Sequence, residues 1–260
     1  MVKSMDAGKV YIGWDVGGWN CDKNSSSRDA LVMLDSNCEI LGFPWRGNLA
    51  HVINESDNQQ AFLSALFGLC ELDYQQQQVV LAIDTPLAFS NAFRNLLNGQ
   101  VSNTHVDSHQ NPYLFRYCER LLAERGFKSL SAIKDMIGAQ ATKGIHVLAK
   151  FVPELVFAGV WQHQNITAIE AYPSPCKYSD YITKLHEVAP WPLFTYTQGK
   201  PMMTNGKIRH QDHIDALTCA FISRLFDTSP EMLWQPDESA PTEEGWIFVP
   251  NDCFVSKEVN

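Results

Sequence analysis

Three absences narrow the class of protein. The sequence has no Cys-x-x-Cys pair, and its seven cysteines are scattered, so it predicts neither a zinc site of that type nor a disulfide framework. It has no apolar run of the roughly 18 residues that a membrane span needs, and residues 1–9 contain no apolar signal core. We therefore expect no membrane partner, reduced thiols and a cytoplasmic location.

Positive charge is also scarce. The chain has 20 Lys and Arg residues against 29 Asp and Glu, which gives a formal net charge of −9. Binding of nucleic acid driven by charge alone needs a basic stripe, and none is present. An enzyme that meets phosphates through a bound metal ion is compatible with this balance. Its partner would be nucleic acid or a smaller phosphodiester, and the oligomeric state stays open.

The chain does contain enough apolar sequence for a sizeable core. Of its 260 residues, 45% are hydrophobic and 19% are charged, which is typical of a globular domain. We find no internal repeat and no convincing boundary, so we expect one domain over 1–260. Within it we expect a helical insertion at about 90–162 and a polar C-terminal tail from 227 to 244.

The order of the predicted strands defines the sheet. Short apolar runs at 9–16, 30–34 and 39–43 flank turn-forming residues, which favours an antiparallel meander. A helical pattern at 57–74 precedes a run at 79–83 that is apolar on both faces, as a covered parallel strand requires. A similar run at 166–171 is the fifth strand. The prediction is an α/β fold with a mixed five-stranded sheet and helices on both faces.

The remaining predicted helices follow from spacing and capping residues. They cover 90–97, 111–126 (beginning at Asn111-Pro112), 142–161 (kinked or split at Pro153), 174–187 and 211–226. A short apolar run at 245–250 should pack back on the body of the protein.

Acidic residues stand at the ends of three predicted strands. Asp15 follows the first, Asp84 the fourth and Glu170 the fifth. The carboxyl ends of strands in an open α/β sheet are where ligands bind. Asp212 and Asp215 are three residues apart on a predicted helix, so they share one face. We expect these acids to converge in one cleft.

Converging carboxylates need a counter-charge. Two like charges about 5 Å apart repel by roughly 3 kcal/mol at an effective dielectric constant near 20. Raised pKa values or divalent cations relieve that repulsion, and ligands that are all oxygen suit Mg²⁺ or Mn²⁺. A pair of such ions cleaves phosphodiesters. For any one acid alone, a turn or helix cap is the simpler interpretation.

Five blocks in a fixed order resemble a known family, the predicted RNase H-like nucleases of domain of unknown function family 429. These blocks are Gly13-Trp14-Asp15 with Gly17-Gly18-Trp19, Ala82-Ile83-Asp84-Thr85-Pro86-Leu87, Glu170-Ala171-Tyr172-Pro173, Asp212-His213-Ile214-Asp215-Ala216-Leu217 and Glu244-Gly245-Trp246-Ile247-Phe248-Val249-Pro250.

The resemblance implies an RNase H-like fold and a metal-dependent nuclease. The helix that contains Asp212 and Asp215 also looks like the terminal helix of RuvC-type resolvases. That similarity implies that Asp15 is the central metal ligand, that Asp84 or Glu170 bridges from a neighbouring strand, and that the two helix acids complete the set. The family's nuclease label is itself inferred from the fold.

Other candidate residues have weaker patterns. His105, Asp107 and His109 alternate in a polar segment and are able to share a metal if the chain is extended there, although a solvated loop explains them as well. Lys143 and Lys177 lie near predicted strand ends, where phosphate contact and plain surface placement are both open.

Two other functions compete with the metal-dependent phosphodiesterase. An actin-like ATP-binding phosphotransferase has a similar sheet, and Asp15-Val16-Gly17-Gly18 resembles its first phosphate loop. The chain is short for the two copies of the fold that such proteins carry, and it has no second loop of that kind. A non-catalytic binding module would keep the acids for structure, with each carboxylate capped by backbone N–H groups and no cleft.

Overall fold

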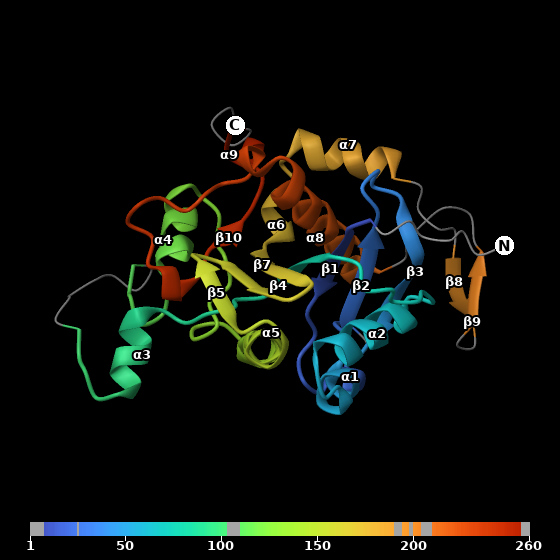
Figure 1. Cartoon of the computed structure of the whole chain (residues 1–260). Coiled ribbons are helices and arrows are strands. Elements are labelled where there is room, and N and C mark those ends of the chain that lie inside the picture. The colour runs from blue at the N-terminus through green and yellow to red at the C-terminus, as the bar shows by residue number, and fades with distance from the viewer. Residues whose placement is uncertain are drawn as a thin grey trace.

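The computed structural model describes residues 8–24, 26–102, 110–189, 194–197, 200–203 and 210–255, with the backbone alone at 194–197, 200–203 and 255. Its central sheet has the predicted order (Figure 1). β1 (Val10–Asp15), β2 (Asp29–Leu34) and β3 (Ile40–Gly47) form the antiparallel meander. β4 (Val79–Asp84) and β7 (Ile166–Ala171) run parallel to β1, in the order β3-β2-β1-β4-β7.

The sheet is larger than predicted. It has eight strands, because β6 (Val160–His163) and β5 (Glu154–Phe157) extend it beyond β7, and β10 (Ile247–Phe248) pairs with the end of β7. The strand β10 confirms that the apolar run at 245–250 packs on the body. A separate hairpin contains β8 (Phe194–Thr197) and β9 (Lys200–Met203).

The predicted helix over 142–161 is wrong in its second half. α5 (Gly138–Phe151) ends before Pro153, and the β5–β6 hairpin follows. Proline disfavours helical backbone in the residue before it, and Val152 lies at φ −142°, outside the helical region. Gly159 then turns the chain at φ +77°, and a side chain there would lie 2.6 Å from the Trp246 backbone N. Hence only glycine fits this turn.

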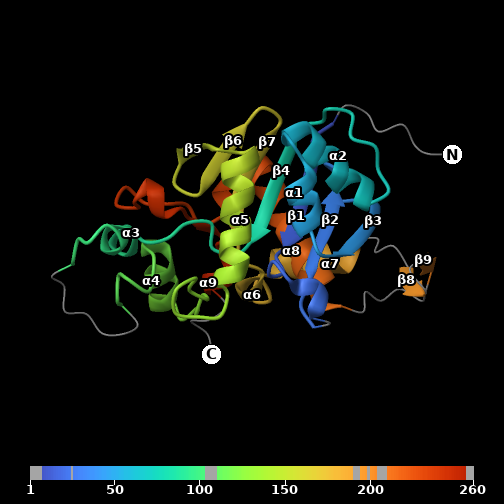
Figure 2. The ribbon, with the colours of Figure 1, turned by 90° about the horizontal axis from the view of Figure 1, so that it is seen from below.

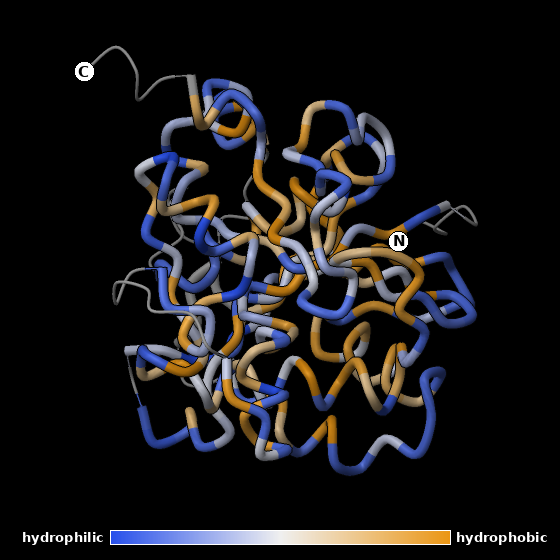
Figure 3. Tube along the Cα trace, turned by 90° about the vertical axis from the view of Figure 1, so that its left-hand side faces the viewer, coloured by the Kyte–Doolittle hydropathy of each residue, from blue (hydrophilic) through white to orange (hydrophobic). Residues whose placement is uncertain are grey.

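Helices cover both faces of the sheet, as predicted (Figures 1 and 2). One core lies between the sheet and α8 (Gln211–Thr228), and the other lies between the sheet and α2 (Gln59–Leu69) with α5. α1 (Ala50–Glu55) packs beside α2. Successive strand residues alternate between the two cores, and apolar segments of the trace concentrate in the interior (Figure 3).

The shorter helices depart from prediction at their ends. α3 (Asn91–Leu97) begins as predicted, capped by the Ser90 hydroxyl. α4 (Tyr117–Glu124) begins six residues after Asn111, because the Asn111 side chain closes a local turn by accepting from Tyr113 N. The predicted helix at 174–187 is split into α6 (Pro173–Cys176) and α7 (Asp180–Val188), and α9 (Asp252–Val255) follows β10. None of the described helices has both the length and the apolar character needed to cross a membrane.

Candidate functional site

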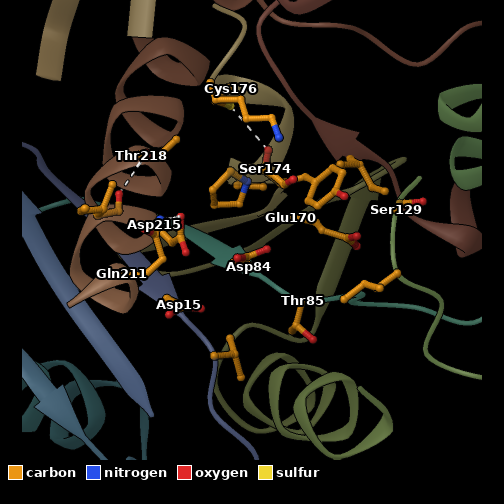
Figure 4. Close-up of a pocket in the computed structure, with 18 of the residues that line it drawn as sticks. Asp15, Asp84, Thr85, Ser129, Glu170, Ser174, Cys176, Gln211, Asp215 and Thr218 are labelled. Carbon is orange, nitrogen blue, oxygen red and sulfur yellow. Dashed lines mark hydrogen bonds between the residues drawn. The ribbon is translucent and has the colours of Figure 1, made fainter. Parts of the chain in front are cut away.

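A pocket of about 770 Å³ opens at the carboxyl ends of β1, β4 and β7. Four of the five predicted acids line it, namely Asp15, Asp84, Glu170 and Asp215, whereas Asp212 does not. In Figure 4, Asp15, Asp84 and Asp215 lie together and Glu170 lies on the other side of Asp84. The pocket therefore contains four of the predicted acids, three of which lie close together, whereas Asp212 lies outside its lining.

The β1–β4 register places Asp15 beside Asp84. The two residues are direct partners in the parallel ladder, so both side chains leave the same face of the sheet. Neighbouring strands are about 4.8 Å apart, so the two side chains leave the sheet as immediate neighbours. That face is the one on which α8 packs, because Gly13 and Ala82, two residues earlier, face the same helix or its core.

Gly13 allows α8 to bring Asp215 to this pair. A Cβ atom at position 13 would lie 1.8 Å from the carbonyl oxygen of Ala216 and 2.4 Å from the backbone N of Ala220. Any residue other than glycine would therefore push the helix off β1. Because the helix backbone rests directly on the strand, Asp215 in its first turns reaches the end of β1.

The three carboxylates are electrostatically strained. Burial raises the pKa of Asp15 well above its ordinary value, and the charges of Asp84 and Asp215 raise it further. Burial likewise raises the pKa of Asp84, followed by the charges of Asp215 and Glu170. Burial also raises the pKa of Asp215, although a hydrogen bond from Gln211 Nε2 at 3.0 Å opposes this. No cation of the described residues opposes these shifts, so the cluster favours proton or cation uptake.

Asp15 and Asp84 are half-buried, and in the described part of the chain they lack the compensating bonds that the buried acids Glu170 and Asp212 have. Among the described residues, no hydrogen bond or ion pair to either carboxylate lowers its pKa. The same residues contain no group of three or more His, Cys, Asp or Glu side chains placed to hold a metal ion by themselves. The described side chains thus supply some carboxylate oxygens but do not complete the coordination shell of a metal ion.

Glu170 is bound by an arginine on the opposite face of the sheet. It pairs with Ile83, one residue before Asp84, so its side chain points toward the α5 side. Arg116 holds both carboxylate oxygens, with Nη1–Oε2 at 2.7 Å and Nη2–Oε1 at 2.6 Å, and Leu87 N donates at 2.8 Å. Burial raises the pKa of Glu170, but the Arg116 charge opposes the shift. Glu170 thus has a cationic partner, Arg116, which it shares with Glu119.

Asp212 also has its own partners. Its Oδ2 accepts from Arg46 Nε at 2.7 Å and from Arg28 N at 3.0 Å, and His210 Nδ1 lies 2.9 Å from Oδ1. The side chain is nearly buried, at 6% exposure for the residue. These contacts fasten the start of α8 to β3 and to the segment before β2.

A buried ion pair that the sequence patterns did not reveal supports the loop after Asp15. Lys143 on α5 and Asp29 at the start of β2 are both fully buried and bonded to each other. Lys143 also donates to the carbonyls of Gly17 and Gly18, each at 3.3 Å, and Asp29 accepts from Gly17 N at 2.9 Å. The one signal in the sequence was a lysine on the apolar face of a helix.

Neither the predicted histidine motif nor comparison with known proteins identifies a function. His105, Asp107 and His109 lie outside the described residues. No family model, no curated protein and no solved structure matches the chain. Function must therefore be argued from the geometry of the pocket.

Proposed function

We propose that the protein is a divalent-metal-dependent hydrolase of phosphodiester bonds, a nuclease of the RNase H-like type. One observation carries the proposal. Asp15 and Asp84 stand side by side on adjacent parallel strands, without compensating bonds among the described residues, in a pocket large enough for a substrate. Half-buried carboxylates this close together are costly to keep charged unless a ligand uses them.

In this proposal Asp15 and Asp84 would supply carboxylate oxygens to Mg²⁺ or Mn²⁺, with Asp215 close by. Mg²⁺ is commonly held by one or two carboxylates, with water and substrate phosphate completing its shell, so a full protein cage is not required. When bound, such an ion polarises a phosphoryl oxygen and lowers the pKa of a bound water. We assign the other two acids to positioning. Asp212 fixes the start of α8, and Glu170 fixes the segment at Leu87.

The architecture supports the same proposal. The strand order β3-β2-β1-β4-β7, with three antiparallel strands followed by two parallel ones, is consistent with an RNase H-like core. A purely structural role would require backbone caps on each carboxylate and no cleft. Asp15 and Asp84 instead line a pocket without such caps among the described residues. No specific observation favours an ATP-binding phosphotransferase.

The test is a cleavage assay on single-stranded, hybrid, duplex and branched nucleic acids with Mn²⁺. We expect metal-dependent cleavage of at least one substrate and a loss of at least 100-fold in Asp15→Asn and Asp84→Asn, since each removes a charge that holds the ion. Asp57→Asn is the matched control, because Asp57 is exposed and far in sequence from the site. Cleavage that survives both site substitutions, or no cleavage of any substrate, would contradict the proposal.

A further inference from the structure

The rim of the pocket carries positive charge of its own. Lys128 and Lys177 are the two cationic side chains among the described lining residues, and both are exposed. In the described part of the chain, neither ammonium group has an ion-pair partner. Lys177 lies over the Tyr178 ring, 5.0 Å from its centroid, and no carboxylate of the described residues neutralises its charge. In a chain with a formal net charge of −9, two such lysines beside an acidic cluster mark a place for an anion.

Two contacts bring the lysines to the same part of the rim. The Tyr172 hydroxyl donates to the carbonyl of Lys128 at 2.8 Å, which ties the segment after α4 to the segment before α6. The rings of Phe127 and Tyr178 also pack, with centroids 5.9 Å apart. Each ring belongs to the immediate neighbour of one lysine. The two segments that carry Lys128 and Lys177 are therefore packed against each other at the rim of one pocket.

A third group lies deeper in the pocket. Thr85 follows Asp84 directly, lines the pocket and is only 5% exposed (Figure 4). Its hydroxyl has no hydrogen-bond partner among the described residues. A buried hydroxyl without a partner is uncommon in native proteins. Beside Asp84, it is available to an oxygen atom of a bound molecule.

We infer that the pocket takes a short single-stranded phosphodiester that enters by one end. This inference rests on the proposed function and names its substrate class. The phosphodiester to be cleaved lies at Asp15 and Asp84, with Thr85 donating to one of its oxygens. The next phosphate along the strand lies between Lys128 and Lys177.

Volume and charge both favour a short strand over a duplex. A cavity of about 770 Å³ is within the range of pockets that enclose small ligands and holds a few nucleotides. A duplex, whose major groove alone is about 12 Å wide, is too large to enter it. Two lysines neutralise one or two phosphates, whereas the acidic remainder of the chain repels a long polyanion.

The experiment measures binding separately from cleavage. Fluorescence anisotropy is recorded for full-length Asp15→Asn protein with a labelled, 5′-phosphorylated tetranucleotide and with a 20-base-pair duplex. Two phosphate contacts to a single strand predict a slope of about −1.4 for log affinity against log salt, or about a sevenfold loss between 50 and 200 mM salt. The double substitution Lys128→Gln and Lys177→Gln should reduce this salt-dependent loss of affinity to under about twofold. Lys184→Gln, at an exposed position that does not line the pocket, should retain the full slope.

Thr85→Val provides a second readout. It should weaken binding of the tetranucleotide about fivefold to tenfold, as expected for one lost hydrogen bond. It should not lower the free energy of unfolding and should raise it slightly, because the buried hydroxyl has no partner in the described structure.

Parallel cleavage assays on wild-type protein with Mn²⁺ separate the two proposals. The inference would be overturned if the duplex binds as tightly as the tetranucleotide, or if the salt dependence of binding is unchanged by the lysine substitutions. This holds even if the protein cleaves nucleic acid. Preferential binding of the tetranucleotide without any cleavage would support the substrate class and overturn the proposed function. Absence of both binding and cleavage would overturn both.

Discussion

Replacing Asp84 by asparagine should make the metal-free protein more stable. Asp84 and Asp15 are register partners on strands about 4.8 Å apart. At an effective dielectric constant near 20, two charges at that distance repel by about 3.5 kcal/mol. Proton uptake already relieves part of this in the wild type, so we expect Asp84→Asn to gain about 2 kcal/mol at pH 8. For a domain of this size the gain corresponds to a rise of roughly 4–8 °C in Tm.

The gain should depend on pH in a defined direction. The pKa values of Asp15 and Asp84 are raised in the folded protein above their ordinary value of 3.8. The folded state therefore binds more protons than the unfolded state, and wild-type stability falls as pH rises from about 4 through the raised values. The asparagine variant loses the part of that dependence that comes from Asp84 itself and from its repulsion of Asp15, whereas burial still raises the pKa of Asp15. The difference between the two proteins should be small near pH 4 and should grow toward pH 8.

Urea denaturation in the presence of a chelator, at several pH values, measures this difference. Asp29→Asn is the matched control with the opposite expected sign, because it leaves the buried Lys143 without its carboxylate and should cost about 3–5 kcal/mol. Adding Mg²⁺ at about 100 times its Kd should stabilise the wild type by about 2.7 kcal/mol and the Asp84→Asn variant by much less. The reasoning is refuted if Asp84→Asn is less stable than the wild type in chelator at every pH.

Three other predictions test the elements that position the site. Gly13→Ala should lower the free energy of unfolding by about 1–3 kcal/mol or more and weaken Mn²⁺ binding, because the added Cβ displaces α8. Gly68→Ala, where an added Cβ meets nothing within 4 Å, should instead stabilise the protein by about 0.5–1 kcal/mol, and equal effects of the two substitutions in calorimetry would contradict this. Lys143→Met should cost about 3–5 kcal/mol in urea denaturation, and adding Asp29→Asn to it should restore part of the loss; no restoration would mean that the charge of Asp29 is not the cause. The affinity for Mn²⁺, measured by titration calorimetry, should rise with pH above the range in which an ordinary aspartate titrates, because the carboxyl groups with raised pKa values must lose their protons to bind the ion. An affinity that stays constant from pH 5 to 8 would count against Asp15 and Asp84 as ligands.

The parts of the fold that could be predicted are those set by local pattern. Apolar runs and turn residues gave the meander and the two parallel strands, and strand-end position was enough to bring Asp15 next to Asp84. The β5–β6 hairpin was missed because an apolar run cannot be told from a buried helix by its period. Pro153 and Gly159 were the local signals for a turn.

The parts of the site that could not be predicted depend on pairing over long distances. The face to which Glu170 points depends on a shift of a single residue in the register of β7 against β4. Its partner Arg116 is 54 residues away, on a segment whose helix start was itself predicted wrongly. The Asp29–Lys143 pair spans 114 residues. Side-chain pairs of this kind follow from tertiary packing, which spacing along the chain does not encode.

The most direct test is a crystal soaked with Mn²⁺ and examined for anomalous scattering. We predict a peak in contact with the carboxylates of both Asp15 and Asp84, at the roughly 2.0–2.2 Å typical of small hard cations bound to oxygen. An anomalous map without a peak at this pair, or with Mn²⁺ bound only elsewhere, would contradict the assignment of a metal-dependent hydrolase.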